Sequence, residues 1–346
     1  MATIEDVARR AGVATSTVSY VISGKRAISA ATRARVEQAI AELDYHPHAG
    51  ARALASSRTD VLALVVPLRL DADTSLRGDV DVNVIMQFVA GVVPRARSLG
   101  YDVLLLTDDD PTALARVAGG SSADALVVMD VETEDARLPA IARSRTPAIL
   151  IGMPVDPQGF SCVDFDFDGA GRLAVRHLAG LGHRRVALIG PPQVVLERHT
   201  SYADRMLHGL RAQSDASGVD LVLTHTSARR DAVAAAVSRA LDGDTPATAL
   251  VVHNEAALPT VMDLLRERSL RVPEDLSVLA VCPPHIAEQQ SVVLTSIDIP
   301  AQQIGATAAE MAVATLRGEL EPETRLVRAA LTDRGSSSAP PARATS

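Results

Sequence analysis

Residues 3–19, with the sequence TIEDVARRAGVATSTVS, decide how the first part of the chain folds. Thr3 and Asp6 have the [Ser/Thr]-x-x-[Asp/Glu] spacing of a capping box, so a short helix is expected to start between them. Gly12 breaks that helix, and residues 15–22 form a second helical run with apolar side chains on one side. The stretch therefore predicts a helix, a glycine turn and a second helix.

The residues that follow supply a third helix. After a loop, Ser29 is a favourable N-cap, and an apolar stripe follows it at helical spacing. The stripe consists of Val36, Ala39, Ile40 and Leu43. Three short helices around one small core describe a helix-turn-helix domain, whose second helix enters the major groove of DNA.

Charge is distributed unevenly along the chain. The 346 residues carry a formal net charge of −8, from 34 basic and 42 acidic residues. Residues 1–58 contain eight basic and five acidic residues, a charge of +3, which leaves 26 basic and 37 acidic residues, or −11, for the remainder. Because neutralised phosphates supply much of the affinity for nucleic acid, the basic head is the part expected to approach a polyanion.

Three segments of the head, residues 3–19, 28–36 and 41–47, together resemble the opening of the lactose-repressor (LacI/GalR) family of bacterial transcription regulators. The resemblance implies a sequence-specific DNA-binding regulator, in most cases a repressor, whose operator affinity is controlled by a small-molecule effector such as a sugar or related metabolite. It also implies a homodimer, and two-fold symmetry then predicts a pseudo-palindromic operator of double-stranded DNA.

The resemblance assigns DNA contacts to the second helix. Thr15, Ser16 and Tyr20 match base-reading positions, and Thr17 and Ser19 match phosphate-binding positions. Short hydroxyl side chains at a helix start can reach base edges or phosphate oxygens, which agrees with these roles. Several family members have arginine where this chain has Tyr20, so bidentate reading of a guanine is not available at that position.

The segment after Pro47 resembles the hinge helix of the same family. In that family paired hinge helices enter the minor groove, and the resemblance places the wedging leucine at Leu54 and a backbone contact at Arg52. Apolar wedges of this kind kink DNA and gain contact area. The segment is short and contains Gly50, so we expect it to form a helix only on DNA. A plain linker with an incidental leucine remains the alternative.

The remainder of the chain alternates short apolar runs with amphipathic helical stretches. The apolar runs are residues 62–66, 103–106, 125–129, 148–151, 186–189, 221–223, 249–252 and 278–281, and the helical stretches include residues 84–99, 170–181, 232–241 and 257–267. Strands that alternate with helices predict parallel sheets covered on both faces. The strands are too many for one compact sheet, so we expect two Rossmann-like lobes whose strand ends face a shared cleft.

The family resemblance continues through these lobes to about residue 332. It implies an all-α helix-turn-helix head followed by a two-lobed α/β effector domain like that of periplasmic binding proteins. The expected divisions are residues 1–46 for the head, 47–59 for the hinge, 60–333 for the effector-binding and dimerisation domain, and 334–346 for a tail. This tail is rich in Ser, Pro and Ala, and disorder is expected.

Effector contacts are also implied by the resemblance. Arg205 matches an arginine that grips effector hydroxyls or carboxylates, a task for which a guanidinium offers a rigid fork of donors. Asn254 and Glu255 match a cleft-lining pair at the end of a strand. Asp166 lies near the expected crossover between the lobes, and a role as a turn or cap residue is an equal alternative.

One departure limits any statement about the effector. Sugar-binding members carry an aspartate where this chain has Cys282, and a thiol cannot bind vicinal hydroxyls as a carboxylate does. The chain has no Trp, so the aromatic faces available for stacking on a sugar are Phe88, Phe160, Phe165, Phe167 and Tyr202. A sugar effector is therefore implied by the family and not by these residues.

Other classes of protein fit the sequence less well. The chain has no phosphate-binding glycine motif, nucleophile elbow or H-E-x-x-H pair, so neither an enzyme nor a cofactor or metal site is expected. No secretory signal and no 18-residue apolar run is found, which predicts a cytoplasmic, nucleoid-associated protein without a membrane partner. A solute-binding protein and a thiol redox regulator acting through Cys282 remain as alternatives.

Overall fold

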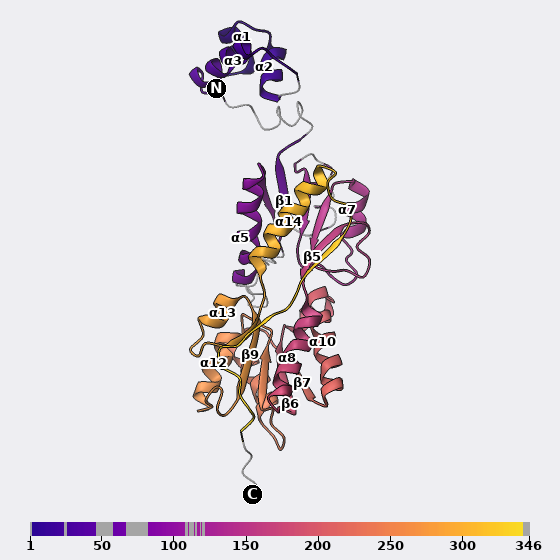
Figure 1. Cartoon of the computed structure of the whole chain (residues 1–346), viewed down its shortest axis with the longest axis vertical. Coiled ribbons are helices and arrows are strands. Elements are labelled where there is room, and N and C mark those ends of the chain that lie inside the picture. Colours follow the sequence, from indigo (N-terminus) through magenta and orange to yellow (C-terminus); the bar gives the residue numbers. More distant parts are fainter. Residues whose placement is uncertain are drawn as a thin grey trace.

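The structure, a computed structural model, describes residues 2–23, 26–45, 58–66, 82–107, 110, 114, 116–117, 119 and 122–341. Figure 1 shows a small helical head followed along the long axis by two α/β lobes. The predicted hinge contacts Arg52 and Leu54 lie outside the described residues. In the described part of the chain, no helix is both long and apolar enough to cross a membrane.

The head has the three helices that the sequence predicts. They are α1 (Ile4–Ala11), α2 (Thr15–Ser23) and α3 (Ala30–Glu42). The capping box is formed, because the Thr3 N–H donates to Asp6 Oδ2 at 2.9 Å and the Asp6 N–H donates to Thr3 Oγ1 at 3.3 Å. Gly12 ends α1 with a φ of 66°, and the Ser29 hydroxyl caps α3. The core consists of Val7, Ala8, Ala11, Val18, Val21, Val36, Ala39 and Tyr45.

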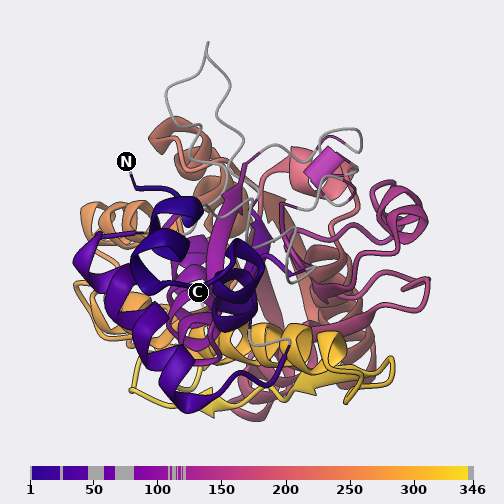
Figure 2. The same ribbon diagram turned by 90° about the horizontal axis from the view of Figure 1, so that it is seen from above.

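The first lobe, here the N-lobe, contains a parallel six-stranded sheet in the order β11-β5-β4-β3-β1-β2. Its strands are β1 (Val61–Val65), β2 (Asp102–Leu106), β3 (Ala125–Val128), β4 (Ala148–Ile151), β5 (Ser161–Phe165) and β11 (Thr324–Val327). Side chains alternate between the faces: Leu62 and Leu64 belong to the core on the side of α5 (Val82–Ser98) and α14 (Ala301–Leu316), and Ala63 and Val65 to the core on the side of α7 (Leu138–Ser144). Seen from above in Figure 2, α14 runs along one side of the strands.

The second lobe, here the C-lobe, repeats this plan in the order β12-β10-β9-β8-β6-β7, with β12 antiparallel to β10. Its strands are β6 (Arg185–Gly190), β7 (Asp220–His225), β8 (Ala249–Val252), β9 (Ser277–Cys282), β10 (Thr295–Asp298) and β12 (Leu331–Thr332). Its helices are α8 (Phe167–Gly180), α9 (Gln193–Glu197), α10 (Ser201–Ser217), α11 (Arg230–Leu241), α12 (Leu258–Glu267) and α13 (Pro284–Glu288). The expected pair of Rossmann-like lobes is confirmed.

Glycines bring one helix pair in each lobe into backbone contact. A Cβ added at Gly91 in α5 would lie 2.0 Å from the carbonyl oxygen of Gln302 in α14. A Cβ added at Gly209 in α10 would lie 2.1 Å from the carbonyl oxygen of Asp168 in α8, and Gly171 in α8 faces α10 in the same way. These helices can pack this closely only because the contact positions lack side chains.

The chain passes between the lobes three times. The crossings join β5 to α8, β10 to α14 and β11 to β12. The N-lobe sheet is therefore built from β1 to β5 and β11, and the C-lobe sheet from β6 to β10 and β12. The first crossing contains Asp166, whose carboxylate accepts from the Gly169 N–H at 3.0 Å and caps α8.

The expectation of disorder from residue 334 onward is wrong for residues 334–341. Ser336 is fully buried, and its hydroxyl donates to the Val278 carbonyl at 2.6 Å. The Ser338 N–H donates to the Ser277 hydroxyl at 3.0 Å. The composition of this segment predicted a solvated tail, but its serines form hydrogen bonds with residues at the start of β9.

Candidate functional site

The start of α2 presents an open set of hydrogen-bond donors. The Ala14 carbonyl accepts from the Thr17 N–H at 2.9 Å and from the Val18 N–H at 3.3 Å, which places Ala14 at the N-cap position. An alanine side chain cannot cap, and the first N–H groups of a helix have no partner within it. The N–H groups of Thr15 and Ser16, whose side chains are exposed, are therefore available to an external acceptor such as a phosphate.

The other predicted DNA contacts lie along the same helix. Thr17, Ser19 and Tyr20 are half-buried. The guanidinium carbon of Arg26 lies 5.8 Å from the centre of the Tyr20 ring, within the range of a cation–π contact. Arg26 thereby places a positive charge beside α2.

Two of the arginines of the head are used within it. Arg9 pairs with Asp6 at 3.1 Å, and Arg10 in α1 pairs with Glu42 in α3 at 2.5 Å. Within the described part of the head, exposed Arg26, Arg33 and Arg35 form no ion pair. These three are the described basic side chains that remain available for a polyanion.

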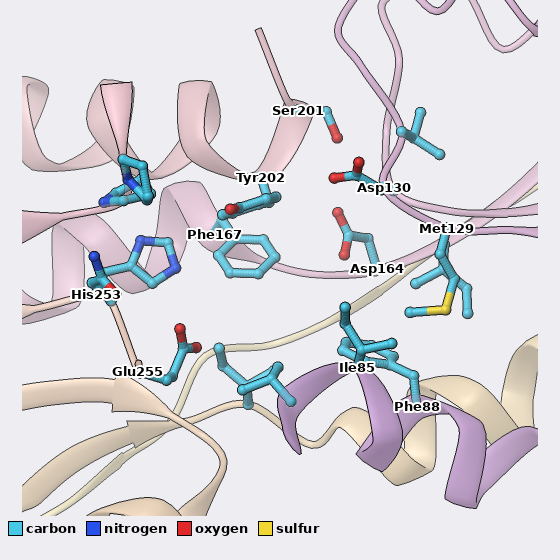
Figure 3. A pocket seen from close by; sticks show the side chains of 18 residues that line it. Ile85, Phe88, Met129, Asp130, Asp164, Phe167, Ser201, Tyr202, His253 and Glu255 are labelled. Atoms are coloured by element: carbon cyan, nitrogen blue, oxygen red, sulfur yellow. The ribbon is translucent and has the colours of Figure 1, made fainter. Parts of the chain in front are cut away.

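A cavity lies between the two lobes, at the carboxyl ends of their strands. The N-lobe contributes residues that follow β3 and β4 and the first turns of α5, and the C-lobe contributes residues that follow β6 and β8 and the start of α10. Figure 3 shows side chains from both lobes turned toward this space. The apolar lining includes Val84, Ile85, Phe88, Met129, Ile151 and Ile299.

A buried ion pair stands at the first crossing between the lobes. Arg205 Nη1 donates to Asp164 Oδ2 at 2.6 Å, and its Nη2 donates to the Phe165 carbonyl at 2.9 Å. Asp164 lines the cavity and is 4% exposed, whereas Arg205 does not belong to the lining. Burial raises the pKa of Asp164 to about 6, against the opposing effect of Arg205. Arg205 therefore acts on the cavity through Asp164.

A second set of contacts joins the lobes beside the cavity. Arg198, just before α10, donates to Asp130 at 2.6 Å and to Glu132 at 2.9 Å, and both acidic residues follow β3. The Ser201 N–H donates to the Val131 carbonyl at 2.9 Å. These bonds, here called the clasp, hold one wall of the cavity to the other.

Aromatic rings form the C-lobe wall of the cavity. The Phe167 ring lies 5.1 Å from Phe165 and 5.5 Å from Tyr202, measured between ring centres. The His253 ring lies 5.7 Å from both Phe167 and Tyr202. Of the aromatic faces that the sequence offers for stacking, the structure thus brings Phe88, Phe167 and Tyr202 to the cavity. Phe160 packs in the N-lobe core instead.

The predicted pair Asn254 and Glu255 lines the cavity at the end of β8. The Asn254 side-chain amide is already used, because it donates to the Thr226 carbonyl at 2.7 Å and accepts from the Ala257 N–H at 3.2 Å. Asn254 therefore fixes the turn that presents Glu255. Asp166 is not among the lining residues and serves as the cap of α8.

Cys282 also lies outside the lining of the cavity. It is 1% exposed in the C-lobe core, and burial raises its pKa well above the ordinary value. The other thiol, Cys162, is buried too, and its pKa is raised to about 11. Such thiols are weak nucleophiles, which opposes the redox alternative. Among the described residues, no three His, Cys, Asp or Glu side chains gather as metal ligands.

Sequence reasoning missed Asp130, Asp164, Arg198 and His253 as parts of this site. Asp130 and His253 each follow a buried strand, as Asn254 does, but the family resemblance pointed only to Asn254 and Glu255 at this strand end. Asp164 lies within β5, whose polar residues hid the strand. The partners of Arg198 are 66 and 68 residues away in the sequence, so no local pattern indicated the clasp.

A helix-turn-helix head joined to two α/β lobes with a cavity between them defines a ligand-responsive DNA-binding regulator. Known sequences agree. The profile of the bacterial regulatory proteins of the lacI family matches residues 3–48, and that of the periplasmic binding protein-like domain matches residues 175–337. The HTH-type transcriptional regulator CelR of Thermobifida fusca is 30% identical over 339 residues, which are 94% of this chain and 95% of that protein. The chain belongs to the LacI family of transcriptional regulators.

Solved structures support the same assignment. The complex of the transcriptional regulator CelR with cellobiose has a TM-score of 0.69 at 27% identity, covering 97% of this chain and 100% of that one. The lac repressor dimer bound to operator and the anti-inducer ONPF has a TM-score of 0.81 at 23% identity, covering 98% and 99% of the chains, and shows the shared fold.

Proposed function

We propose that this chain is a repressor that binds a pseudo-palindromic operator as a homodimer, with an affinity set by a small molecule held between its lobes. It acts in the cytoplasm, where the DNA is, and has no catalytic activity. The observation that carries the proposal is that one chain combines the open start of α2 with a cavity built from both lobes.

On the DNA side, Thr15, Ser16 and Tyr20 read bases from α2, and Thr17 and Ser19 hold phosphates. The N–H groups at the start of α2 have no partner within the helix, which supports contact with a phosphate or base edge at that point. The resemblance to the family places Arg52 and Leu54 in the minor groove, where the leucine wedges between base pairs.

On the effector side, the ligand is a sugar or related metabolite. The relative CelR has been solved with cellobiose, which supports this class. Glu255 and Asp164 contact the ligand from the C-lobe and from the crossing, Asn254 presents Glu255, and Arg205 holds Asp164 in place. Cys282 and Asp166 act only through the packing of the C-lobe and of α8.

Control by the effector is a shift between two arrangements of the lobes. A ligand that contacts both walls of the cavity changes how the lobes sit, and the clasp is the set of bonds that such a movement alters. The operator affinity then changes only as far as the ligand binds the two arrangements with different affinity.

The test is a gel shift of the purified full chain with the DNA upstream of its own gene. Retention at protein concentrations that leave random duplex unbound supports the proposal, and the Thr15→Ala, Ser16→Ala double variant should lose that preference. A thermal-shift screen of sugars, nucleosides and small acids on the same protein then identifies ligands to add to the gel. A protein that retains both DNAs equally, with and without every ligand, contradicts the proposal.

A further inference from the structure

The helix α2 contains no side chain that can hold a base by two hydrogen bonds from one planar group. Its nine residues are TSTVSYVIS, so its polar side chains are hydroxyls, and none carries a charge or an amide. In the major groove, strong discrimination between bases comes mainly from arginine or lysine on guanine, or from an amide side chain on adenine. A side chain outside α2 is therefore expected to supply such a contact.

Arg26 is an exposed arginine that lies directly beside α2. It follows the last residue of α2, Ser23, by three positions, in the loop before α3. Its guanidinium carbon lies 5.8 Å from the centre of the Tyr20 ring, over the face of that ring. Within the described residues it forms no hydrogen bond or ion pair. A cation over a ring is held by the face of the ring, so the guanidinium N–H groups remain available to an outside acceptor.

The side of α2 that carries Tyr20 is the side turned away from the core of the head. Ser16 and Tyr20 are four residues apart, so they share one face of the helix. Val18 and Val21 lie on the opposite face, where they are 0% and 8% exposed in the core. The Arg26 guanidinium therefore stands at the face of α2 that the proposed function turns toward the base edges.

The ring distinguishes Arg26 from the other described arginines of the head. Arg9 and Arg10 form ion pairs within the head. Arg33 and Arg35 are exposed on α3, and among the described arginines of the head only Arg26 lies over an aromatic ring. A side chain that is already restrained loses less conformational entropy when it binds. Arg26 is thus prepared for a contact of defined direction, which a base edge requires and a phosphate does not.

We infer that Arg26 reads a guanine in each operator half-site, and that Tyr20 is a positioning residue whose ring holds the Arg26 guanidinium. Two N–H groups of the rigid guanidinium fork donate to O6 and N7 of the guanine, the two acceptors on its major-groove edge. This inference rests on the proposed function and deepens it, because it names a base and the side chain that reads it. Tyr20 takes part in base reading through Arg26.

A panel of altered operators tests the inference with the full chain. Selection from a random duplex library with the wild type supplies the operator, and each of its base pairs is then replaced symmetrically in both half-sites. Fluorescence anisotropy measures the affinity for every duplex. Replacing one particular G·C pair by A·T should weaken binding of the wild type at least tenfold. Arg26→Ala should bind the original operator about tenfold more weakly and should bind this A·T duplex equally well, while it keeps the wild-type preferences elsewhere.

Variants of Tyr20 separate the ring from its hydroxyl. Tyr20→Phe keeps the ring under Arg26 and should keep the guanine preference of the wild type. Tyr20→Leu removes the ring and should reduce that preference about twofold to fivefold. The matched control is Arg33→Ala, which removes another exposed arginine of the head and should show the base preferences of the wild type at every position. Unfolding temperature is measured for every variant, so that a loss of fold is not mistaken for a loss of base reading.

Two results with Arg26→Ala would overturn the inference. Binding that is weakened by the same factor on every duplex would assign Arg26 to a phosphate, and base preferences identical to those of the wild type would remove it from base reading. Loss of the guanine preference in Tyr20→Phe would show that the hydroxyl reads the base and would overturn the positioning role. In all these cases the operator preference of the wild type still stands, whereas a wild type that enriches no motif would contradict the proposed function itself.

Discussion

The substitution Gly209→Ala tests how closely α8 and α10 pack beneath the cavity. The new methyl group would lie 2.1 Å from the Asp168 carbonyl oxygen and 2.8 Å from its carbon, where ordinary contacts begin near 3.4 Å. The obstacle is helix backbone, so α10 must move away by about 1 Å. Overpacking of this kind costs about 1–3 kcal/mol, and the better helix propensity of alanine returns about 1 kcal/mol. We expect a net loss of up to about 2 kcal/mol relative to the wild type, and a loss of about 1–3 kcal/mol relative to a helix glycine-to-alanine change that meets no obstacle.

Gly180→Ala is the matched control, because Gly180 is exposed at the end of α8 and an added Cβ meets nothing within 4 Å. It should leave stability unchanged or raise it slightly. The assay is thermal unfolding of the full chain, in which Gly209→Ala should lower Tm by up to roughly 8 °C and should unfold at a lower temperature than Gly180→Ala. Because α10 carries Ser201 and Tyr202 into the cavity, Gly209→Ala should also weaken effector binding. A Gly209→Ala protein as stable as Gly180→Ala would refute the backbone contact.

Three further predictions concern the cavity and the hinge. Arg205→Ala leaves Asp164 as a buried charge without its partner, so it should lower the free energy of unfolding by about 3–5 kcal/mol, abolish the effector response and leave operator affinity intact. Adding Asp164→Asn should recover part of the stability in urea unfolding. An Arg205→Ala protein that is stable and still responds to the effector would contradict this role. His253 and Asp164 should have opposite pH dependences. The pKa of His253 is lowered from 6.5 to about 4, so the unfolded chain binds the extra proton, and the contribution of His253 to the free energy of unfolding rises by about 3 kcal/mol from pH 4 to 6.5. The pKa of Asp164 is raised from 3.8 to about 6, so the folded chain binds the extra proton, and the contribution of Asp164 falls by about 3 kcal/mol from pH 3.8 to 6. Urea unfolding of wild type, His253→Phe and Asp164→Asn between pH 4 and 7 measures the two differences, and slopes of the same sign would be inconsistent with these burial effects. Leu54→Ala should weaken operator binding strongly in a fluorescence-anisotropy titration and leave nonspecific binding nearly intact, whereas equal loss of both would count against the wedge.

Local signals in the sequence predicted the head and most of the strands. Thr3, Asp6, Gly12 and Ser29 take the cap and turn positions expected of them, because caps depend on side chains within a few residues. Uniform apolar runs predicted β1 to β4 and β6 to β9. Six of these strands are almost wholly buried and require apolar side chains on both faces, whereas the edge strands β2 and β7 are only partly buried.

The sequence did not predict β5, whose apolar pattern is interrupted by polar residues, or α14, whose apolar side chains lie on several sides of the helix. All five residues of β5 are buried, yet Ser161 and Asp164 interrupt its apolar pattern. The helix α14 buries residues on several sides, from Ala301 to Val313, and so has no polar stripe to reveal its period. Ser336 and Ser338 likewise read as a solvated tail until the chain folds back on β9.

The candidate site was predictable only in outline. Topology predicted a cleft at the carboxyl ends of the strands, and the family resemblance pointed to Asn254 and Glu255, which both line the cavity. The partners of Arg205 and Arg198 depend on crossings between the lobes, and such pairings over 41 to 68 residues leave no local signal. His253 stands out only in the structure, where its lack of a partner can be seen.

The most direct measurement is selection of bound sequences from a random duplex library by the purified full chain, repeated with the sugar that the thermal-shift screen identifies. We expect one two-fold symmetric motif to be enriched, and its enrichment to change when the sugar is present. A library that emerges without any enriched motif, under both conditions, would contradict the account that this head reads DNA and that these lobes control it.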